Sequence, residues 1–169
     1  MTDTLLPLLV ALPLVMAAAG VGLPARVMLP IMVATPLVTA AGGVLLLVEH
    51  ATGDPVVATQ VGAFVPGIAI PLVSDTLAAL MLTVTGLTTA VCLGFSALCG
   101  EARLRYFPTL ALTLVAGVNG ALLTGDLFNL FVFIEVMLLP SYALIAMSGT
   151  WRRLAVGRLF VVVNLMTST

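Results

Sequence analysis

The sequence predicts an all-α, polytopic membrane protein, and two observations support this fold class. Hydrophobic residues make up 62% of the 169 residues and charged residues only 8%, with a mean hydropathy of +1.28. A soluble domain has about 25% charged residues, so this chain cannot form a fully wetted surface. In addition, uncharged windows of about 20 residues or more follow one another along the chain. Each is long enough to cross a hydrocarbon core of about 30 Å.

These windows predict five complete transmembrane helices and the start of a sixth. The first window is too long, and too closely followed by the second, to be a cleaved signal peptide. The last window is interrupted: eleven residues follow Arg158, or about 16 Å of helix, which is half a bilayer. We therefore expect residues 1–169 to be the N-terminal fragment of a larger transmembrane domain. The predicted helices span residues 5–23, 27–48, 76–99, 106–124, 127–148 and 155–169, the last of them incomplete.

The first two predicted helices are rich in proline and contain no candidate functional residue. They contain Pro7, Pro13, Pro30 and Pro36, more than a soluble helix tolerates. Membrane helices accept proline because neighbouring groups satisfy the backbone carbonyls that it leaves without a partner. Neither helix carries an ionisable group inside its span, so both are interpreted as packing helices.

The long loop over residues 49–75 favours a short β-hairpin at the outer membrane surface. Two β-branched runs, "PVVATQV" and "GIAIPLV", flank a region with turn-forming residues, Gly62–Gly67. An amphipathic cap lying on the membrane is the alternative. The third helix then begins with Ser74 or Asp75 in the N-cap position.

The arginines predict the orientation. All six basic residues are arginines, and counting the helical hairpins places them at one end of the bundle. Because Arg and Lys mark the cytoplasmic side of bacterial membrane proteins, we expect the N-terminus outside. Trp151 and Tyr106 stand beside the arginines, as interfacial aromatic residues do. The opposite, outer end holds five carboxylates: Asp3, Glu49, Asp54, Asp75 and Asp126.

Glu135 is the one charged residue inside the five complete predicted spans, and it is the first candidate for function. It lies nine residues beyond Asp126, so about 13 Å from the outer surface and close to the bilayer midplane. An ionised residue at that depth costs about 2.5–3.5 kcal/mol on insertion scales, and intramembrane acids are functional by default. The alternative is a hydrogen-bonded glutamate that only holds helices together.

Four other residues are candidates for an ion path. Pro140 has no N–H, which leaves the carbonyl of Val136 beside Glu135 without its helical partner. Tyr142 lies seven residues after Glu135, on the same helical face, where it can donate a hydrogen bond or simply pack. The remaining two have structural alternatives as well: Asn119 as a helix–helix packing residue between small residues, and Asp126 as a helix cap.

Other chemistries find little support in the sequence. Cys92 and Cys99 are interpreted as small packing residues, and His50 as an interfacial residue with a minor alternative role in proton entry. No catalytic triad, phosphate-binding glycine loop or haem attachment motif is present, so we expect no cofactor, no metal and no catalytic site of its own. A net charge of −1 gives no case for nucleic-acid binding.

A family resemblance becomes visible at this point. The stretch "GVNGALLTGDLFNLFVFIEVMLLPSYAL" resembles the antiporter-like membrane subunits shared by bacterial Mrp-type multisubunit Na+/H+ antiporters and respiratory complex I. It looks most like the D subunit of the Mrp type. The segments "PLVSDTLAALML" and "TGDPVVATQVGAF" resemble the same protein, and the similarity runs over nearly the whole chain.

The resemblance implies a bundle of about fourteen helices in which Glu135 relays protons. In the family this glutamate pairs with a lysine on a later helix, and this chain has no lysine. The implied function is a proton-translocating subunit of a monovalent cation (Na+ or K+)/H+ antiporter. Other membrane subunits are the expected partners, and the bacterial inner membrane is the expected location. Two alternatives remain: a proton-pumping subunit of an NADH:quinone oxidoreductase or membrane hydrogenase, and a truncated product that does not transport.

Overall fold

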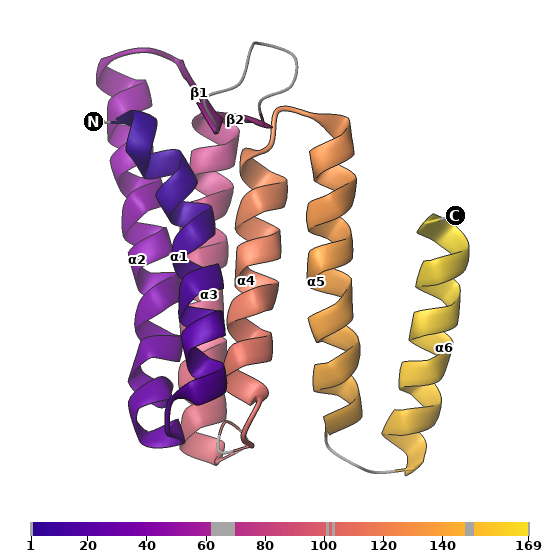
Figure 1. Ribbon diagram of the computed structural model, residues 1–169. Coiled ribbons are helices and arrows are strands. Elements are labelled where there is room, and N and C mark those ends of the chain that lie inside the picture. The colour runs from indigo at the N-terminus through magenta and orange to yellow at the C-terminus, as the bar shows by residue number, and fades with distance from the viewer. Residues whose placement is uncertain (1, 62–69, 101, 103, 148–150, 169) are drawn as a thin grey trace.

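The computed structural model describes residues 2–61, 70–100, 102, 104–147 and 151–168. Six helices stand side by side and a two-stranded hairpin lies across one end of the bundle (Figure 1). Helices α1 to α4 form a cluster in which α2 packs against α3 and α1 against α4, while α5 and α6 extend it on one side. The elements are α1 (Thr2–Gly22), α2 (Ala25–Thr52), β1 (Val56–Val61), β2 (Ile70–Asp75), α3 (Thr76–Cys99), α4 (Phe107–Leu123), α5 (Leu127–Met147) and α6 (Trp151–Ser168).

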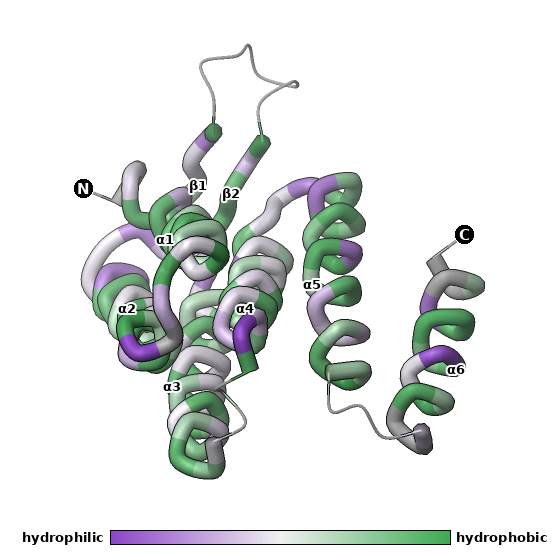
Figure 2. The backbone as a smooth tube through the Cα atoms, turned by 60° about the horizontal axis from the view of Figure 1, so that its bottom comes forward, coloured by the Kyte–Doolittle hydropathy of each residue, from purple (hydrophilic) through white to green (hydrophobic). Residues whose placement is uncertain are grey.

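Four of the described helices, α1, α2, α3 and α5, are long and apolar enough to cross a membrane. Helix α4 is equally apolar but has 17 residues, or about 26 Å, and α6 carries a shorter apolar stretch, Leu154–Asn164. The number of complete spans therefore stays a prediction. Apolar residues lie on all sides of the helices rather than along one stripe (Figure 2), which suits a lipid environment.

Helices α2 and α6 extend furthest beyond their predicted limits. Helix α2 continues to Thr52, so that Glu49 and His50 lie in its last turns rather than in a loop. Helix α6 begins at Trp151, four residues before the predicted start, and so includes Arg152 in its first turn. In both cases the uncharged window predicts the membrane-spanning segment. The helix continues past this segment because charged and aromatic residues are compatible with helical backbone.

The predicted hairpin is present in the structure. Strands β1 and β2 pair antiparallel with a register from Val56 opposite Asp75 to Val61 opposite Ile70. The predicted Gly62–Gly67 turn lies outside the described residues. The hairpin is fixed to the bundle because Leu72 is buried with residues of four helices: Leu6, Leu9, Leu46, Leu82 and Leu123.

Asp75 is the N-cap of α3, where its Oδ1 accepts a hydrogen bond of 2.7 Å from the amide of Ala78. His50 fixes Ser74, the residue before this N-cap, to the end of α2. Its Nε2 lies 3.1 Å from the hydroxyl of buried Ser74, and its Nδ1 lies 3.0 Å from the carbonyl oxygen of Asp54. Since Nδ1 must donate to that carbonyl, a neutral His50 accepts from Ser74 at Nε2. The histidine thus holds the hairpin to α2.

Asn119 explains how α1 tolerates one of its prolines. Pro13 has no N–H, so the carbonyl of Leu9 has no partner four residues along α1. The Nδ2 group of Asn119 on α4 donates to that carbonyl at 2.8 Å and lies 3.3 Å from the Thr39 hydroxyl of α2. Asn119 is 1% exposed. Asn119 therefore joins three helices and replaces the hydrogen bond to the Leu9 carbonyl that Pro13 removes.

We predict that Asn119→Leu destabilises the folded protein by about 1–2 kcal/mol, because the carbonyl of Leu9 is then buried without a donor. Pro13→Ala restores the missing amide, so the double variant should show a smaller penalty than the two single effects combined. A double-mutant cycle on thermal unfolding in detergent measures this coupling. Purely additive effects would mean that the two residues act independently.

Candidate functional site

Glu135 lies in the middle of α5, eight residues or about 12 Å from the first residue of that helix. The side chain is half-buried, and its Oε1 is shielded from the surface. Among the residues that the structure describes, no group donates a hydrogen bond to this oxygen. A shielded carboxyl oxygen without a donor is costly, and this makes Glu135 the candidate residue of the site.

Helix α5 turns Glu135 away from its contact with α4. The α4 contact is made by Phe133 and Met137, which pack against two glycines: a Cβ at Gly117 would lie 2.9 Å from the Met137 Cβ, and one at Gly120 would overlap the Phe133 ring. At 100° per residue, Glu135 lies about 160–200° from both contact residues. The carboxylate therefore lies on the side of α5 opposite α4.

Tyr142 shares this face of α5 and contacts α6. Its ring packs edge-on against Phe160, with the ring centroids 5.2 Å apart. Seven residues separate it from Glu135, which is about 10 Å along the helix axis, too far for a direct hydrogen bond. In the structure Tyr142 is a packing residue on the side to which Glu135 also points.

The other candidate residues do not converge on Glu135. Asn119 faces α1 and α2, on the side of α4 away from α5. Asp126 precedes α5 and caps it, since its Oδ2 accepts from the amide of Asn129 at 3.2 Å. Pro140 is the one buried residue among those described in α5, and the Ser141 hydroxyl beside it donates to the carbonyl of Met137 at 2.7 Å. The site is thus a single carboxylate on a kink-prone helix.

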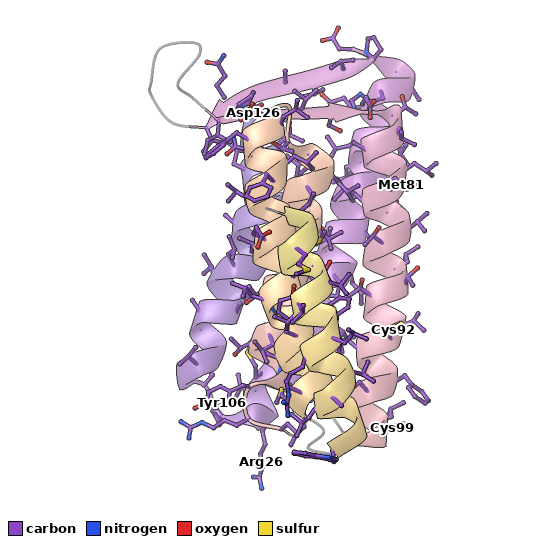
Figure 3. The ribbon with its side chains drawn as sticks, turned by 90° about the vertical axis from the view of Figure 1, so that its right-hand side faces the viewer. Arg26, Met81, Cys92, Cys99, Tyr106 and Asp126 are labelled. Carbon is purple, nitrogen blue, oxygen red and sulfur yellow. The ribbon has the colours of Figure 1, made fainter. Side chains whose placement is uncertain are left out.

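The two ends of the bundle carry opposite charges. Arg26 and Tyr106 lie at the end opposite Asp126 (Figure 3), and the guanidinium of Arg105 lies 5.4 Å from the Tyr106 ring centroid.

Cys92 and Cys99 are both free and exposed on α3. Within the described part of the chain, no three His, Cys, Asp or Glu side chains lie close enough to hold a metal ion.

Sequence reasoning missed the partners of two polar residues, those of Asn119 and His50. The prolines of α1 indicated that carbonyls need donors, but nothing in the sequence pairs Leu9 with Asn119, 110 residues away. His50 was interpreted as an interfacial residue, and the only signal for its contact with Ser74 was that both flank the same loop.

The fold is a bundle of apolar helices, four of them long enough to cross a membrane, with an isolated carboxylate in the middle of α5. Comparison with known proteins narrows the class. The chain is 46% identical over 101 residues to the D subunit of the Na+/H+ antiporter of Alkalihalophilus pseudofirmus, and the match covers 59% of this chain and 20% of that protein. No family model matches the chain.

Two solved structures share the fold. A chain of the Mrp complex from Dietzia sp. superposes with a TM-score of 0.92 at 44% identity, covering 99% of this chain and 32% of that one. A chain of an archaeal respiratory membrane complex, the membrane-bound sulfane sulfur reductase, gives a TM-score of 0.85 at 26% identity, covering 96% of this chain and 34% of that one.

The resemblance to antiporter-like membrane subunits is therefore confirmed: this chain is a homologue of the D subunits of Mrp-type antiporters. It spans about 20% of the length of the curated relative and 32% of the solved chain. Its apolar helices and this similarity identify the chain as part of a membrane protein.

Proposed function

We propose that this chain forms part of a proton-translocating membrane subunit of a monovalent cation/H+ antiporter, with Glu135 as the proton relay. The supporting observation is the shielded Glu135 oxygen without a donor among the described residues, in a chain 46% identical over 101 residues to the D subunit of an Na+/H+ antiporter. Ionisable residues inside membrane spans mark ion pathways and proton relays, which favours a functional role for Glu135.

The proposed setting is the inner membrane of a bacterium, with the arginine end in the cytoplasm and the N-terminus outside. The charge distribution supports this orientation, since Arg26 and Arg105 lie at the end opposite Asp126. Other membrane subunits of a hetero-oligomeric antiporter would cover α5, of which only 6% of the span is buried. Protons and Na+ or K+ are the proposed substrates.

A second function is supported by the respiratory neighbour. The membrane-bound sulfane sulfur reductase matches 96% of this chain, so the same helices also occur in a redox-linked complex. In that setting the relay through Glu135 would be driven by electron transfer in other subunits. Genes for iron–sulfur or quinone-module subunits beside this one would favour the redox complex, and genes for further antiporter subunits would favour exchange.

The proposal is tested in everted vesicles that contain the complete gene product with its partner subunits. A pH gradient is set up by respiration of the host, and the dissipation of this gradient on addition of NaCl or KCl is followed with a ΔpH-sensitive dye. We expect Na+ or K+ to dissipate the gradient, and choline chloride to have no effect. Proton pumping that depends on an electron donor to the complex itself, with no response to either cation, would support the redox alternative instead.

A further inference from the structure

Asn164 is a polar residue deep in α6. It lies 13 residues after Trp151, the first residue of that helix, which is about 20 Å along the helix axis. Since α6 begins at the arginine end of the bundle (Figure 1), this distance places Asn164 inside the hydrocarbon core of about 30 Å. Polar side chains at such depth bond across helices or line a polar path.

The amide of Asn164 is held in one orientation by its own helix. Its Nδ2 donates a hydrogen bond of 2.8 Å to the carbonyl oxygen of Phe160, one turn earlier. This carbonyl can only accept, so the atom that bonds it must be the amide nitrogen. Within the described part of the chain this is the one hydrogen bond of the side chain. The Oδ1 atom of Asn164 therefore remains an acceptor for a further group.

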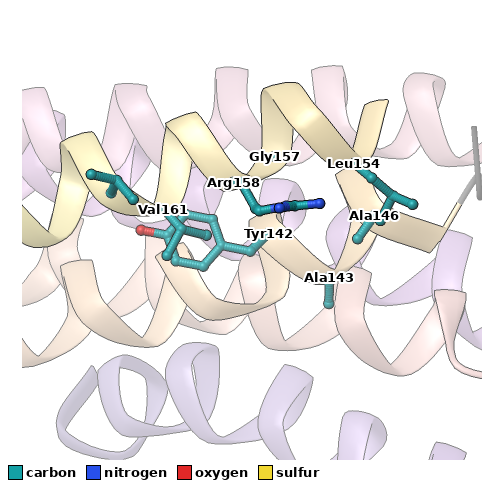
Figure 4. Close-up of a pocket in the computed structure, with 8 residues that line it drawn as sticks. Tyr142, Ala143, Ala146, Leu154, Gly157, Arg158 and Val161 are labelled. Carbon is teal, nitrogen blue, oxygen red and sulfur yellow. The ribbon is translucent and has the colours of Figure 1, made fainter. Parts of the chain in front are cut away.

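Asn164 lies on the side of α6 that faces α5. One contact on that side is the Phe160 ring, which packs edge-on against Tyr142, and Figure 4 shows the Tyr142 ring facing α6. The other is Gly157, where a Cβ would lie 3.5 Å from the Cγ2 of Ile145. At 100° per residue, Asn164 is about 20° from Gly157 and about 40° from Phe160 around the helix. It is therefore between the two contact positions.

Glu135 occupies the matching side of α5. It stands seven residues before Tyr142, so the two lie about 20° apart around the helix. The two contacts also fix an antiparallel register, in which three residues forward on α5 correspond to three residues back on α6. Extended towards the hairpin, this register places Asn164 level with Leu138, about 4.5 Å along the axis from Glu135. The carboxyl and the amide thus lie on facing sides of neighbouring helices, at nearly the same depth.

We propose, on the basis of the function proposed above, that Asn164 is a positioning residue for proton exchange at Glu135. One water molecule joins the two side chains: it donates to the Oδ1 of Asn164 and accepts from the protonated carboxyl of Glu135. Two hydrogen bonds of about 2.8 Å through one water span up to about 5 Å, which suits the axial offset. The proton moves from the carboxyl to this water, which passes a proton to the next water. Asn164 takes no proton and only orients the water.

The test uses the complete gene product with its partner subunits in the everted-vesicle assay. Asn164→Leu keeps a branched side chain and removes the amide. We expect cation-dependent exchange to become about tenfold slower, as for the loss of one hydrogen bond. Val163→Leu, at a position about 100° around the helix, is the control and should leave exchange unchanged. Co-purification of the partner subunits measures assembly. Normal exchange in an assembled Asn164→Leu complex would overturn the proposal.

A pair of length changes separates positioning from helix packing. Glu135→Asp withdraws the carboxyl by one methylene, and Asn164→Gln advances the amide by one. Each change alone should slow exchange, whereas the double variant should exchange faster than Glu135→Asp alone because the distance across the water is restored. Packing gives no reason for such a rescue. A double variant no faster than Glu135→Asp would therefore overturn the proposal, and this comparison also decides if Asn164→Leu fails to assemble.

The result for Glu135→Gln keeps this proposal apart from the proposed function. If Glu135→Gln is inactive while Asn164→Leu exchanges normally, the relay stands and the positioning role of Asn164 fails. Normal exchange in Glu135→Gln would remove the relay itself, and the role of Asn164 with it.

Discussion

Replacing Glu135 with glutamine is expected to abolish cation-dependent proton exchange while the complex still assembles. Glutamine has nearly the same shape and keeps an oxygen at the Oε1 position, but it cannot gain and lose a proton. A positioned proton-transfer group contributes about 10²–10⁴ in rate, so exchange should fall at least about 100-fold. The measurement is the dissipation of the pH gradient by Na+ or K+ in everted vesicles.

Glu135→Asp distinguishes a relay from a structural anchor. Aspartate keeps the titratable group and withdraws it by one methylene, so a relay should retain partial exchange. A structural role would show the opposite order, because glutamine fills the space and aspartate leaves a gap. Asp75→Asn serves as the matched control: it makes the same acid-to-amide change at the N-cap of α3, where Asn caps as well as Asp. Normal exchange in Glu135→Gln would make the residue structural.

The architecture was largely predictable because the signals for it are local. A run of about 20 uncharged residues has few alternatives to a transmembrane helix, and the hairpin was foreseen from two β-branched runs around turn residues. Asp75 and Asp126 cap their helices as their positions before apolar runs predicted. The ends of α2 and α6 were less predictable, because charge marks the limits of the membrane rather than the limits of a helix.

The arrangement of the site was less predictable, because it depends on contacts between distant segments. Glu135 was recognised from its depth alone, but its direction follows from the packing of Phe133 and Met137 on the glycines of α4. Asn119 was a candidate for the ion path because it is polar and buried. Its bonding to the carbonyl that Pro13 exposes is visible only when α1 and α4 are placed side by side.

Gly86→Ala is expected to be among the most damaging single changes in the bundle. A Cβ at this position of α3 would lie 2.7 Å from the carbonyl oxygen of Pro36 and 2.8 Å from the amide nitrogen of Ala40, both in the backbone of α2. Backbone cannot rotate out of the way as a side chain can, so the two helices must separate. Overpacking of this kind costs about 1–3 kcal/mol, and it acts on the contact that positions the N-terminal half of the bundle.

Gly94→Ala provides the control within the same helix. Here a Cβ meets no other atom within 4 Å, and alanine has a higher helix propensity than glycine by about 1 kcal/mol. Thermal unfolding of the detergent-purified protein should therefore show a lower midpoint for Gly86→Ala and an unchanged or higher midpoint for Gly94→Ala. Because both variants add one methyl group to α3, only the distance to α2 differs between them. Equal midpoints for the two variants would show that the close approach of α2 and α3 contributes nothing to stability.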